Sequence, residues 1–330
     1  VIYYKNRIPK DFSAIPLTVY SDLERKTFPS ISMVLEQYYS EKNAATRIKQ
    51  RSADLRQIVS SALSKNYKKY DLQRKQLKNT EKRDKYRIYG ELLTTYGYSS
   101  KAGDKTLHCT NYYDNTEITI PLDTELEPME NAKKYFDKYG KLKRTYEALS
   151  QIVLETRQEI EHLESISTAL DIATNENDLK ALKEELVQYG YIRRKSGDKK
   201  LKFTNKPMHF IVDDTTQIYI GKNNYQNEEV TFKIATGNDW WFHAKGIPGS
   251  HVIVKCSLEE LPDSAFELAG TLAAYYSKGR EMDKVEIDYI QKKHVKKVNG
   301  GAPGFVIYHT NYSMVCTPAS PDQLGLISEK

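Results

Sequence analysis

The sequence has few of the residues that build disulfide frameworks, and it has no stretch long enough to span a membrane. Its 330 residues include only three cysteines, which are far apart and odd in number. Cys109, Cys256 and Cys316 therefore make neither a disulfide framework nor a CxxC metal site. No apolar run approaches the roughly 18 residues that a transmembrane helix needs. We expect a cytoplasmic protein that holds no metal or cofactor and has no membrane partner.

The N-terminus also lacks a signal-peptide pattern, and the chain begins with Val1 instead of Met. We therefore expect residues 1–30 to be the tail end of a longer N-terminal region that this sequence does not include. The remaining length, with 39% hydrophobic residues overall, is enough for two or three domains with cores of their own.

Positive charge is concentrated in two segments, although the net charge of the chain is only +6. Residues 64–87 hold ten Lys or Arg against three acidic residues, and residues 193–206 hold seven against one. These segments contribute +7 and +6, which leaves −7 for the rest of the chain. Such clustering is typical of a surface that binds a polyanion such as nucleic acid. A solvated helix face followed by a flexible basic linker is the alternative.

Heptad periodicity predicts two long helices that pair as an antiparallel coiled coil. The first lies within residues 31–96, and residues 129–189 hold the second together with a short helix. Each apolar stripe is too narrow to be buried alone, so the helices should pack together as an arm on the order of 90 Å long. The stripe of the first helix consists of Tyr38, Ala45, Ile48, Ser52, Leu55, Val59, Ala62, Leu63, Tyr67, Tyr70 and Leu77. The stripe of the second consists of Tyr135, Tyr139, Leu142, Tyr146, Leu149, Val153, Thr156, Ile160, Leu163, Ser167 and Leu170.

A small tip domain is predicted between the two helices, over residues 97–128. Residues 106–112 and 116–120 have the composition of strands, and the turn-forming group Tyr113-Asp114-Asn115 separates them. This insert would lie at the far end of the arm, beside the basic run of residues 64–87. A structured, charged tip is suited to docking against a large anionic body, and the alternative is a cap that prevents fraying.

The C-terminal part is predicted to be a separate α/β domain over residues 208–330, joined to the arm by a basic linker over residues 190–207. The fold class is therefore α+β. One helix is expected over residues 263–280. Strands are expected over residues 209–213, 216–220, 229–234, 239–243, 251–255, 305–309 and 312–316.

The motifs of common catalytic sites are absent. Gly221-Lys222 lacks the upstream glycine and the following Ser or Thr of a phosphate-binding P-loop. His243 and His251 have no further ligand at a metal-binding spacing, and Ser250 does not lie in a GxSxG elbow. We therefore expect no enzymatic activity from this chain on its own.

Aromatic, amide and cationic side chains are interleaved in the C-terminal domain, which is typical of a nucleic-acid surface. Aromatic rings can stack on bases, amides can read base edges or cap the local backbone, and cations can bind phosphates. Taken alone, each aromatic residue favours a place in the core over a stacking role. The candidate RNA-binding residues are Lys222, Asn223, Asn224, Gln226, Asn227, Trp241, His243, Lys245, Ser250, His251, Lys278, Arg280, Lys293, Lys296 and Lys297.

Several of these segments resemble one known family. GKNNYQN, WFHAKGIPGSHVIVK, AAYYSKGRE and VKKVNGGAPGFVIY are similar to the C-terminal RNA-binding domain of the NFACT family, whose bacterial members are called RqcH-like or fibronectin-binding protein A-like. The resemblance extends upstream through DKYRIYGELL, TIPLD and ENAKKYFDKYGKLKR, so it covers essentially the whole chain. The family's N-terminal domain is expected to precede Val1. The family usually has an acidic residue where Gly246 stands here, and Lys-Pro-Asn-Gly where residues 297–300 stand.

The resemblance implies a ribosome-associated quality-control factor. Such a factor binds stalled large ribosomal subunits and tRNA, alanine tRNA in bacteria, and supports alanine tailing. It also implies that the arm and its tip contact the subunit, with Lys65, Lys68, Lys69, Arg74, Lys75, Lys82 and Arg83 as candidate ribosome-binding residues. Two alternatives stay open. One is a surface adhesin for fibronectin or fibrinogen, displayed without a signal peptide, and the other is a purely structural coiled-coil scaffold.

Overall fold

The structure, a computed structural model, describes residues 1–5, 8–194, 206–257 and 260–327. Its contacts divide the chain into two compact units. The first unit comprises Val1–Leu63 together with Glu161–Lys330, and the second comprises Ser64–Ile160. Most of the predicted basic linker, residues 195–205, lies outside the described residues. No helix of the described residues is long and apolar enough to cross a membrane.

The first unit begins with a small antiparallel sheet that the sequence patterns did not predict. Its strands β1 (Ile2–Lys5), β2 (Ile8–Phe12) and β3 (Glu24–Lys26) lie in the order β2-β1-β3. Ile2 and Tyr4 pack against Val34 and Tyr38 of the following helix. Periodicity missed the sheet because β2 contains a proline and β3 consists of three exposed charged residues.

Three helices form the rest of the N-terminal half of this unit. They are parts of α1 (Ile31–Asn79) and α3 (Pro128–Ile172), and α4 (Glu176–Gln188). Leu55 and Val59 of α1, Leu163 and Ile166 of α3, and Leu182 of α4 share one apolar core. Asn175 starts α4 with a capping box, in which its side chain accepts from the backbone while Asp178 bonds back to the cap.

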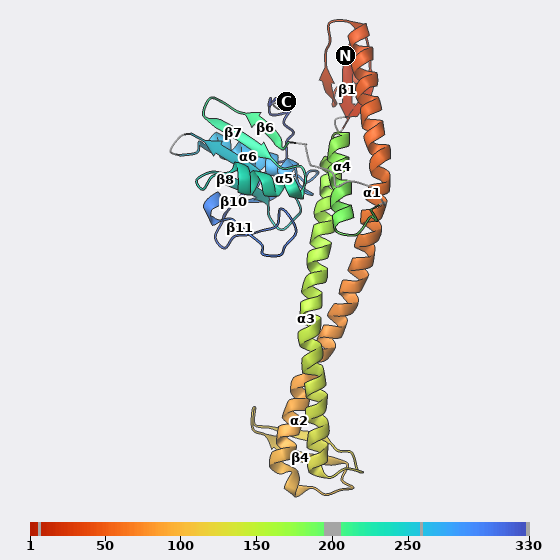
Figure 1. Cartoon of the computed structure of the whole chain (residues 1–330), viewed down its shortest axis with the longest axis vertical. Coiled ribbons are helices and arrows are strands. Elements are labelled where there is room, and N and C mark those ends of the chain that lie inside the picture. Colours follow the sequence, from red (N-terminus) through yellow and green to blue (C-terminus); the bar gives the residue numbers. More distant parts are fainter. Residues whose placement is uncertain (6–7, 195–205, 258–259, 328–330) are drawn as a thin grey trace. The chain divides into compact units, whose positions relative to one another are not determined.

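A six-stranded antiparallel sheet follows, in the order β13-β10-β8-β9-β7-β6. Helix α6 (Asp263–Tyr275) packs on one face around Phe242 and Leu272 (Figure 1). The other face buries Trp241 and Ile253 against the segment after β7. The strands are β6 (Met208–Ile211), β7 (Thr216–Ile220), β8 (Trp240–Ala244), β9 (Val252–Cys256), β10 (Val285–Gln291) and β13 (Tyr312–Cys316).

Five of the predicted strands of this domain are confirmed to within a few residues, and the predicted helix is confirmed in its first three quarters. The strand predicted over residues 229–234 is wrong. This segment is a π-helical turn, η4 (Val230–Ile234), that continues helix α5 (Asn224–Glu229). Residues 305–309 contain only the two-residue strand β12 (Val306–Ile307), which pairs with β11 (Lys296–Lys297). Strand β10, which lies between β8 and β13, was missed.

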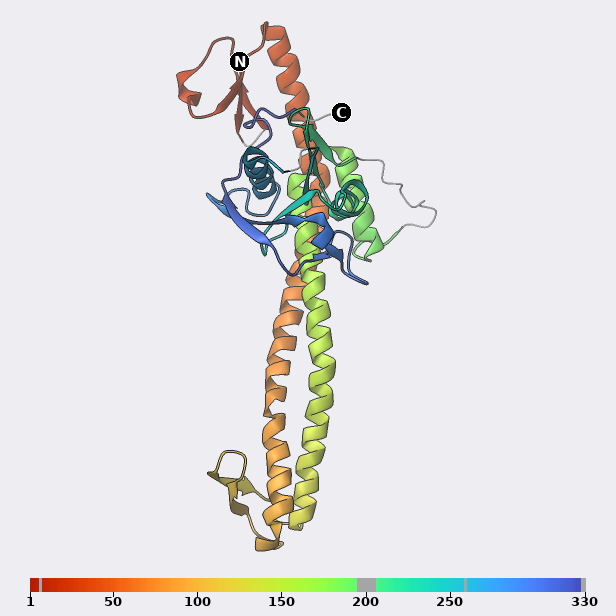
Figure 2. The same cartoon turned by 90° about the vertical axis from the view of Figure 1, so that its left-hand side faces the viewer.

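The second unit contains a helical pair and a hairpin (Figure 2). The final turns of α1 lead through η2 (Thr80–Lys82) into α2 (Arg83–Tyr96) and η3 (Gly97–Ser99). The hairpin of β4 (Thr106–Asn111) and β5 (Thr116–Pro121) then packs its inward residues on α2 and on the start of α3. Both predicted strands and the turn between them are confirmed, and the turn residue Asn115 adopts a left-handed φ of 56°.

The predicted stripe of the second helix is buried or half-buried at every position within this unit, from Tyr135 to Ile160. In the first helix the predicted stripe holds at Tyr70 and Leu77, which are half-buried, and fails at Tyr67. Tyr67 is 40% exposed, and Asn66 takes the buried position beside it. Gln73 and Thr80 are buried on the same face, so this part of the interface contains several polar side chains.

Replacement of Leu92 tests the core of the second unit. Leu92 has no exposed surface, so Leu92→Ala should cost about 2–5 kcal/mol of unfolding free energy, because it leaves a cavity. Leu72→Ala is the matched control, since this leucine lies on a helix of the same unit but is 58% exposed. Urea unfolding followed by far-UV circular dichroism measures both variants. Equal midpoints for the two variants would contradict the packing described.

Candidate nucleic-acid interface

The turn after β7 uses its amides to complete its own backbone. The side chain of Asn223 accepts a hydrogen bond from the Gln226 amide at 3.0 Å and so caps α5. Gln226 Oε1 in turn accepts from the Lys222 amide at 3.0 Å. A Cβ at Gly221 would lie 2.6 Å from the Asn227 nitrogen, so the close approach of these segments requires glycine. The amides predicted to read bases are therefore buried and bonded to the chain itself.

Asn227 joins this turn to the segment before β9. Its Nδ2 donates to the Gly249 carbonyl at 3.3 Å, and its Oδ1 accepts from the His251 amide at 3.0 Å. The His251 ring continues the chain of polar contacts, with Nδ1 lying 2.8 Å from Thr231 Oγ1. Asn227 and His251 thus hold α5 and η4 against the sheet.

Buried charges connect the same turn to helices α3 and α4. Lys222 Nζ lies 2.8 Å from Asp178 Oδ1, and these side chains are 8% and 2% exposed. Asn224 Nδ2 donates to Glu185 Oε1 at 2.8 Å, and His162 Nε2 lies 2.9 Å from the same oxygen. We refer to His162, Asp178, Glu185, Lys222 and Asn224 as the docking network. It fixes the sheet domain to the helices of its own unit, so Lys222 and Asn224 face protein and not solvent.

The aromatic and histidine candidates are also turned inward. Trp241 has no exposed surface, and its ring lies 5.6 Å from His243 and 5.1 Å from His251 between centroids. Stacking on a base requires an exposed ring face, which Trp241 does not present here. Ser250 is 2% exposed, and its hydroxyl has no hydrogen-bond partner among the described residues.

Burial keeps the two histidines neutral. It lowers the pKa of His243 to about 4, against the opposing influence of its hydrogen bond to Gly249 and of the Asp288 carboxylate. Burial, together with the neighbouring His243, also lowers the pKa of His251 well below its usual range. Neither ring carries charge near neutral pH, so neither acts as a phosphate-binding cation there.

Apart from Lys222, the cations predicted for the C-terminal domain fall into two groups at opposite ends of β8. One group surrounds the turn at residues 246–249. There Lys245 pairs with Glu286, and Lys278 pairs with Glu164 at 3.2 Å. Arg280 is half-buried, with its guanidinium 4.4 Å from the Tyr275 ring centroid. Every member of this group already has a partner inside the protein.

The second group lies just beyond the end of β10 and consists of Lys293, Lys296 and Lys297, which are exposed, and Lys292, which is half-buried. We call these four lysines the β10-end cluster. The backbone amides of Lys292 and Lys293 donate to the carbonyls of Asp239 and Gly237, which fixes the segment beside the start of β8. Lys297 pairs with Glu228 at 2.7 Å. Within the described part of the chain, Lys293 and Lys296 form no ion pair, so they are free to bind an anion.

Most of the cations predicted for the second unit are exposed along α1 and η2: Lys65, Lys68, Lys69, Arg74, Lys75 and Lys82. Lys69 lies 3.9 Å from Glu159. Arg83 differs from the others, because its guanidinium stacks on Tyr146 at 3.9 Å and its Nη1 is buried. Arg83 therefore packs within the unit, while the remaining six are accessible.

Sequence reasoning missed the helical half of the docking network. His162, Asp178 and Glu185 lie on amphipathic helices, where charged residues normally face water. Only Asp178 carried a signal, since Asn175 three residues earlier is spaced for a capping box.

Together these features define an α+β protein. Its sheet domain is fixed to the helices of its own unit by the docking network, and it presents exposed lysines beyond the end of β10. A family model of the NFACT N-terminal and middle domains matches residues 1–204, and a model of the NFACT protein RNA-binding domain matches residues 206–309. The chain therefore belongs to the NFACT family.

Relatives in two bacteria have similar sequences. The chain is 39% identical to the Rqc2 homolog RqcH of Streptococcus pneumoniae, over 94% of this chain and 55% of that protein. It is 38% identical to the Rqc2 homolog RqcH of Bacillus subtilis, over 89% of this chain and 52% of that protein. The chain thus spans about half the length of these relatives.

A solved structure is similar as well. The C-terminal part of the fibronectin/fibrinogen-binding protein from Streptococcus suis matches with a TM-score of 0.68 and 34% identity. The match covers 85% of this chain and 99% of that structure. Its sequence identity and coverage agree with the family assignment.

The docking network can be tested by removing one charge from it. Lys222→Met leaves Asp178 buried without its cation, which should cost about 3–5 kcal/mol. Lys297→Met removes an exposed pair and should cost about 0–1 kcal/mol, so it is the control. The two tryptophans of the chain, Trp240 and Trp241, both lie in β8, so intrinsic fluorescence during urea unfolding reports on the sheet domain. A loss for Lys222→Met no larger than for Lys297→Met would show that the network does not hold the domain.

Acid should destabilise the sheet domain through the half-buried His243 and the buried His251. The pKa of His243 is about 4 in the folded protein, so the unfolded chain binds more protons between the ordinary histidine pKa of about 6.5 and pH 4. Stability therefore falls as the pH falls through this window, by up to about 3 kcal/mol at 1.36 kcal/mol per pKa unit. The tryptophan-monitored urea midpoint at pH 7, 6, 5 and 4 measures the loss.

The contribution of His243 to this pH dependence is the difference between the wild type and His243→Gln, since carboxylates titrate in both proteins. His243→Gln should flatten the profile, whereas His294→Gln, at an exposed position, should follow the wild type. Identical slopes for all three proteins would contradict the assignment of the acid sensitivity to His243.

Proposed function

We propose that this chain is the RNA- and ribosome-binding part of a cytoplasmic ribosome-associated quality-control factor. In this proposal the factor binds stalled large ribosomal subunits and alanine tRNA and supports alanine tailing. Support comes from the match of residues 206–309 to the NFACT RNA-binding domain and from relatives that are named as homologs of Rqc2. The chain contributes binding surfaces, and we assign it no catalytic step.

The β10-end cluster is the observation that carries the RNA-binding part of the proposal. Lys293 and Lys296 are exposed and precede a glycine-rich turn, in which Gly300 and Gly304 adopt φ values of 71° and 77°. Free ammonium groups beside an exposed backbone are suited to phosphate contacts. The other cations that were candidates in this domain have partners inside the protein, so Lys293 and Lys296 are the candidates best placed to bind an RNA phosphate.

We further propose that α1 and α3 form an antiparallel coiled-coil arm, with residues 97–128 as a small domain at its tip that docks on the ribosomal subunit. The burial of the heptad positions in α3 supports the pairing. The exposed cations Lys65, Lys68, Lys75 and Lys82 support an anionic docking partner.

One observation favours a second function. The similar structure from Streptococcus suis is that of a fibronectin/fibrinogen-binding protein, so an adhesin for such a host protein is the alternative. The exposed edge strand β13, with Tyr312 and Val315 more than 60% exposed, offers a place for strand addition. Binding of this kind depends only weakly on salt, whereas phosphate binding depends on it steeply.

Titration of labelled alanine tRNA against residues 1–330, followed by fluorescence anisotropy over a series of salt concentrations, tests the proposal. We expect binding with a steep negative salt slope. Lys293→Glu/Lys296→Glu should weaken it and should lower the magnitude of the slope by about 1.4–1.8, at 0.7–0.9 per phosphate contact. The matched control, Lys180→Glu/Lys183→Glu, makes the same charge change at exposed positions of α4.

Two outcomes of this titration would count against the proposal. Equal losses in both double variants would show that RNA responds to total charge and not to the β10-end cluster. Absence of tRNA binding at low salt, combined with salt-insensitive binding of fibronectin, would favour the adhesin.

A further inference from the structure

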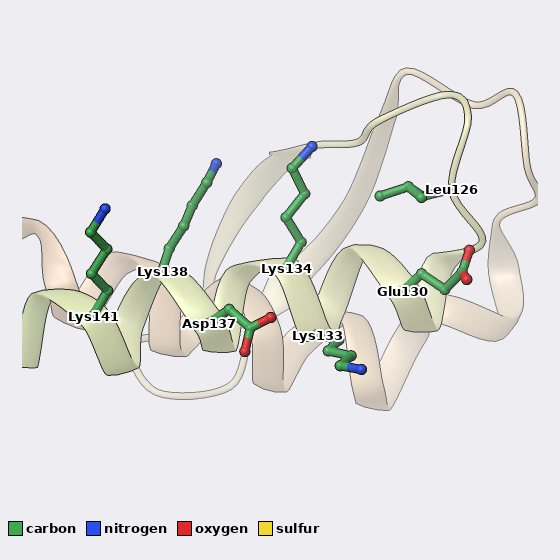
Figure 3. Close-up of a pocket in the computed structure, with 7 residues that line it drawn as sticks. All are labelled: Leu126, Glu130, Lys133, Lys134, Asp137, Lys138 and Lys141. Atoms are coloured by element: carbon green, nitrogen blue, oxygen red, sulfur yellow. The ribbon is translucent and has the colours of Figure 1, made fainter.

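A groove of about 350 Å³ lies between α1 and α4 in the first unit, where the two helices pack side by side (Figure 1). Its lining is mainly apolar. The hollow along the first turns of α3, in the second unit, differs because four lysines and two carboxylates line it (Figure 3). A charged hollow of that kind attracts anions without favouring one of them. An apolar floor instead favours a partner that has apolar surface of its own to bury.

Both helices supply the floor of the groove. Leu55 of α1 and Leu179 of α4 belong to the core that these helices share with α3, and both also line the groove. Ile192, which follows α4, and Ile58 of α1 line it as well and are half-buried. Part of the apolar surface of these two isoleucines therefore stays in water. A partner that covers it would gain the free energy of removing that surface from water.

The positions that line the groove repeat on both helices with the same spacing. On α1 they lie between residues 51 and 58, on α4 between residues 176 and 183, and on each helix successive positions are three, one and three residues apart. Residues spaced in this way lie on one face of a helix. The groove thus extends for two turns, about 10 Å, along both helices. Because α1, α3 and α4 already share one core, a further helix laid on α1 and α4 would complete a four-helix bundle.

The charges at the two rims of the groove differ in sign. Arg51 and Glu176 pair with each other at 2.5 Å, so they have little to offer a partner. Lys180 and Lys183, on the α4 rim, are exposed and form no ion pair within the described part of the chain. Asp54, on the α1 rim, is also exposed and has no ion pair among the described residues. The α4 rim is therefore positive, and the α1 rim carries a single negative charge.

We propose that this groove binds an amphipathic helix of a partner protein, with an apolar stripe on the floor and carboxylates on the flank that faces Lys180 and Lys183. Docking of this kind reads residues at helical spacing, which both walls of the groove match. Asp54 repels a carboxylate, so the acidic flank must face α4, and this requirement sets the direction of the bound helix. A nucleic-acid backbone has no apolar surface to cover the floor. None of the residues assigned to RNA lines the groove, so the two kinds of binding can be lost separately.

Two labelled helical peptides of about 14 residues, or four turns, test the proposal. Both have a leucine stripe with glutamine along one flank, and the other flank carries glutamates in the acidic peptide and lysines in the basic one. Fluorescence anisotropy at low salt measures their binding to residues 1–330. We expect the wild type to prefer the acidic peptide. Ile58→Ala should weaken binding of both peptides about tenfold, because the floor loses apolar contact.

Replacement of the rim lysines separates binding in the groove from a general loss of structure. Lys180→Glu/Lys183→Glu should reverse the preference, so that the basic peptide binds more tightly, with a change of about tenfold or more in the ratio of the two affinities. Misfolding would weaken both peptides and could not produce such a reversal. The matched control is Arg47→Glu/Lys49→Glu, which makes the same charge change at exposed positions of α1 that do not line the groove, and it should keep the preference for the acidic peptide.

Several results would overturn the proposal. They are absence of binding of both peptides to the wild type, an unchanged preference in the rim variant, and an equal reversal in the control. Equal affinity for both peptides, with displacement of both by laurate, would mean that the groove takes any apolar ligand. A dimer in sedimentation equilibrium that Ile58→Ala dissociates would show that a second copy of the chain occupies it. If alanine tRNA binds but neither peptide does, the proposed function stands and the groove proposal alone fails.

Discussion

The position of the sheet domain in its unit depends on charges that are buried between the turn after β7 and the helices α3 and α4. Lys222 and Asp178 are at most 8% exposed, and Glu185 is fully buried while it accepts from Asn224 and contacts His162. Removing either member of such a pair leaves a charge in a medium of low polarity. The contact is therefore selective: another orientation of the domain would bury these groups without their partners. An apolar contact of the same area would allow more than one orientation.

This constraint divides the cations of the chain into two classes. Lys222 and Arg83 are committed to the interior, one by an ion pair and the other by stacking on Tyr146. Lys293 and Lys296 lie just beyond the end of β10, where backbone hydrogen bonds hold their segment. Their charged groups therefore stay in water. Exposed cations lose little by exchanging water and counterions for phosphate, whereas buried ones would first have to break their pairs.

The sequence predicts periodic features well and burial of polar residues poorly. The stripe from Tyr135 to Ile160 and the hairpin around Asn115 were predictable, because local periodicity and turn chemistry determine them. The strand predicted over residues 229–234 failed, because the Asn223 cap starts a helix whose winding continues through β-branched residues. Strand β10 alternates Val285, Ile287 and Tyr289 with polar residues, so its pattern was present and was passed over. For the candidate site, residue type alone could not separate the inward-facing Asn224 and His251 from the outward-facing Lys293, since only the tertiary contacts do so.

Polar residues in the helix interface of the second unit bear on the position of a cation on α3. Asn66, Gln73 and Thr156 are buried there, and Gln73 Oε1 and Thr156 Oγ1 have no hydrogen-bond partner within the described residues. Polar groups at such positions reduce stability and disfavour alternative registers. The register in turn decides which residue of α2 meets which residue of α3. Because Tyr86 stacks on Tyr135 at 5.9 Å, and Lys138 lies over both rings, a shift of the helices would move this ammonium away from its place. The cost in stability is thus coupled to the pre-positioning of a cation.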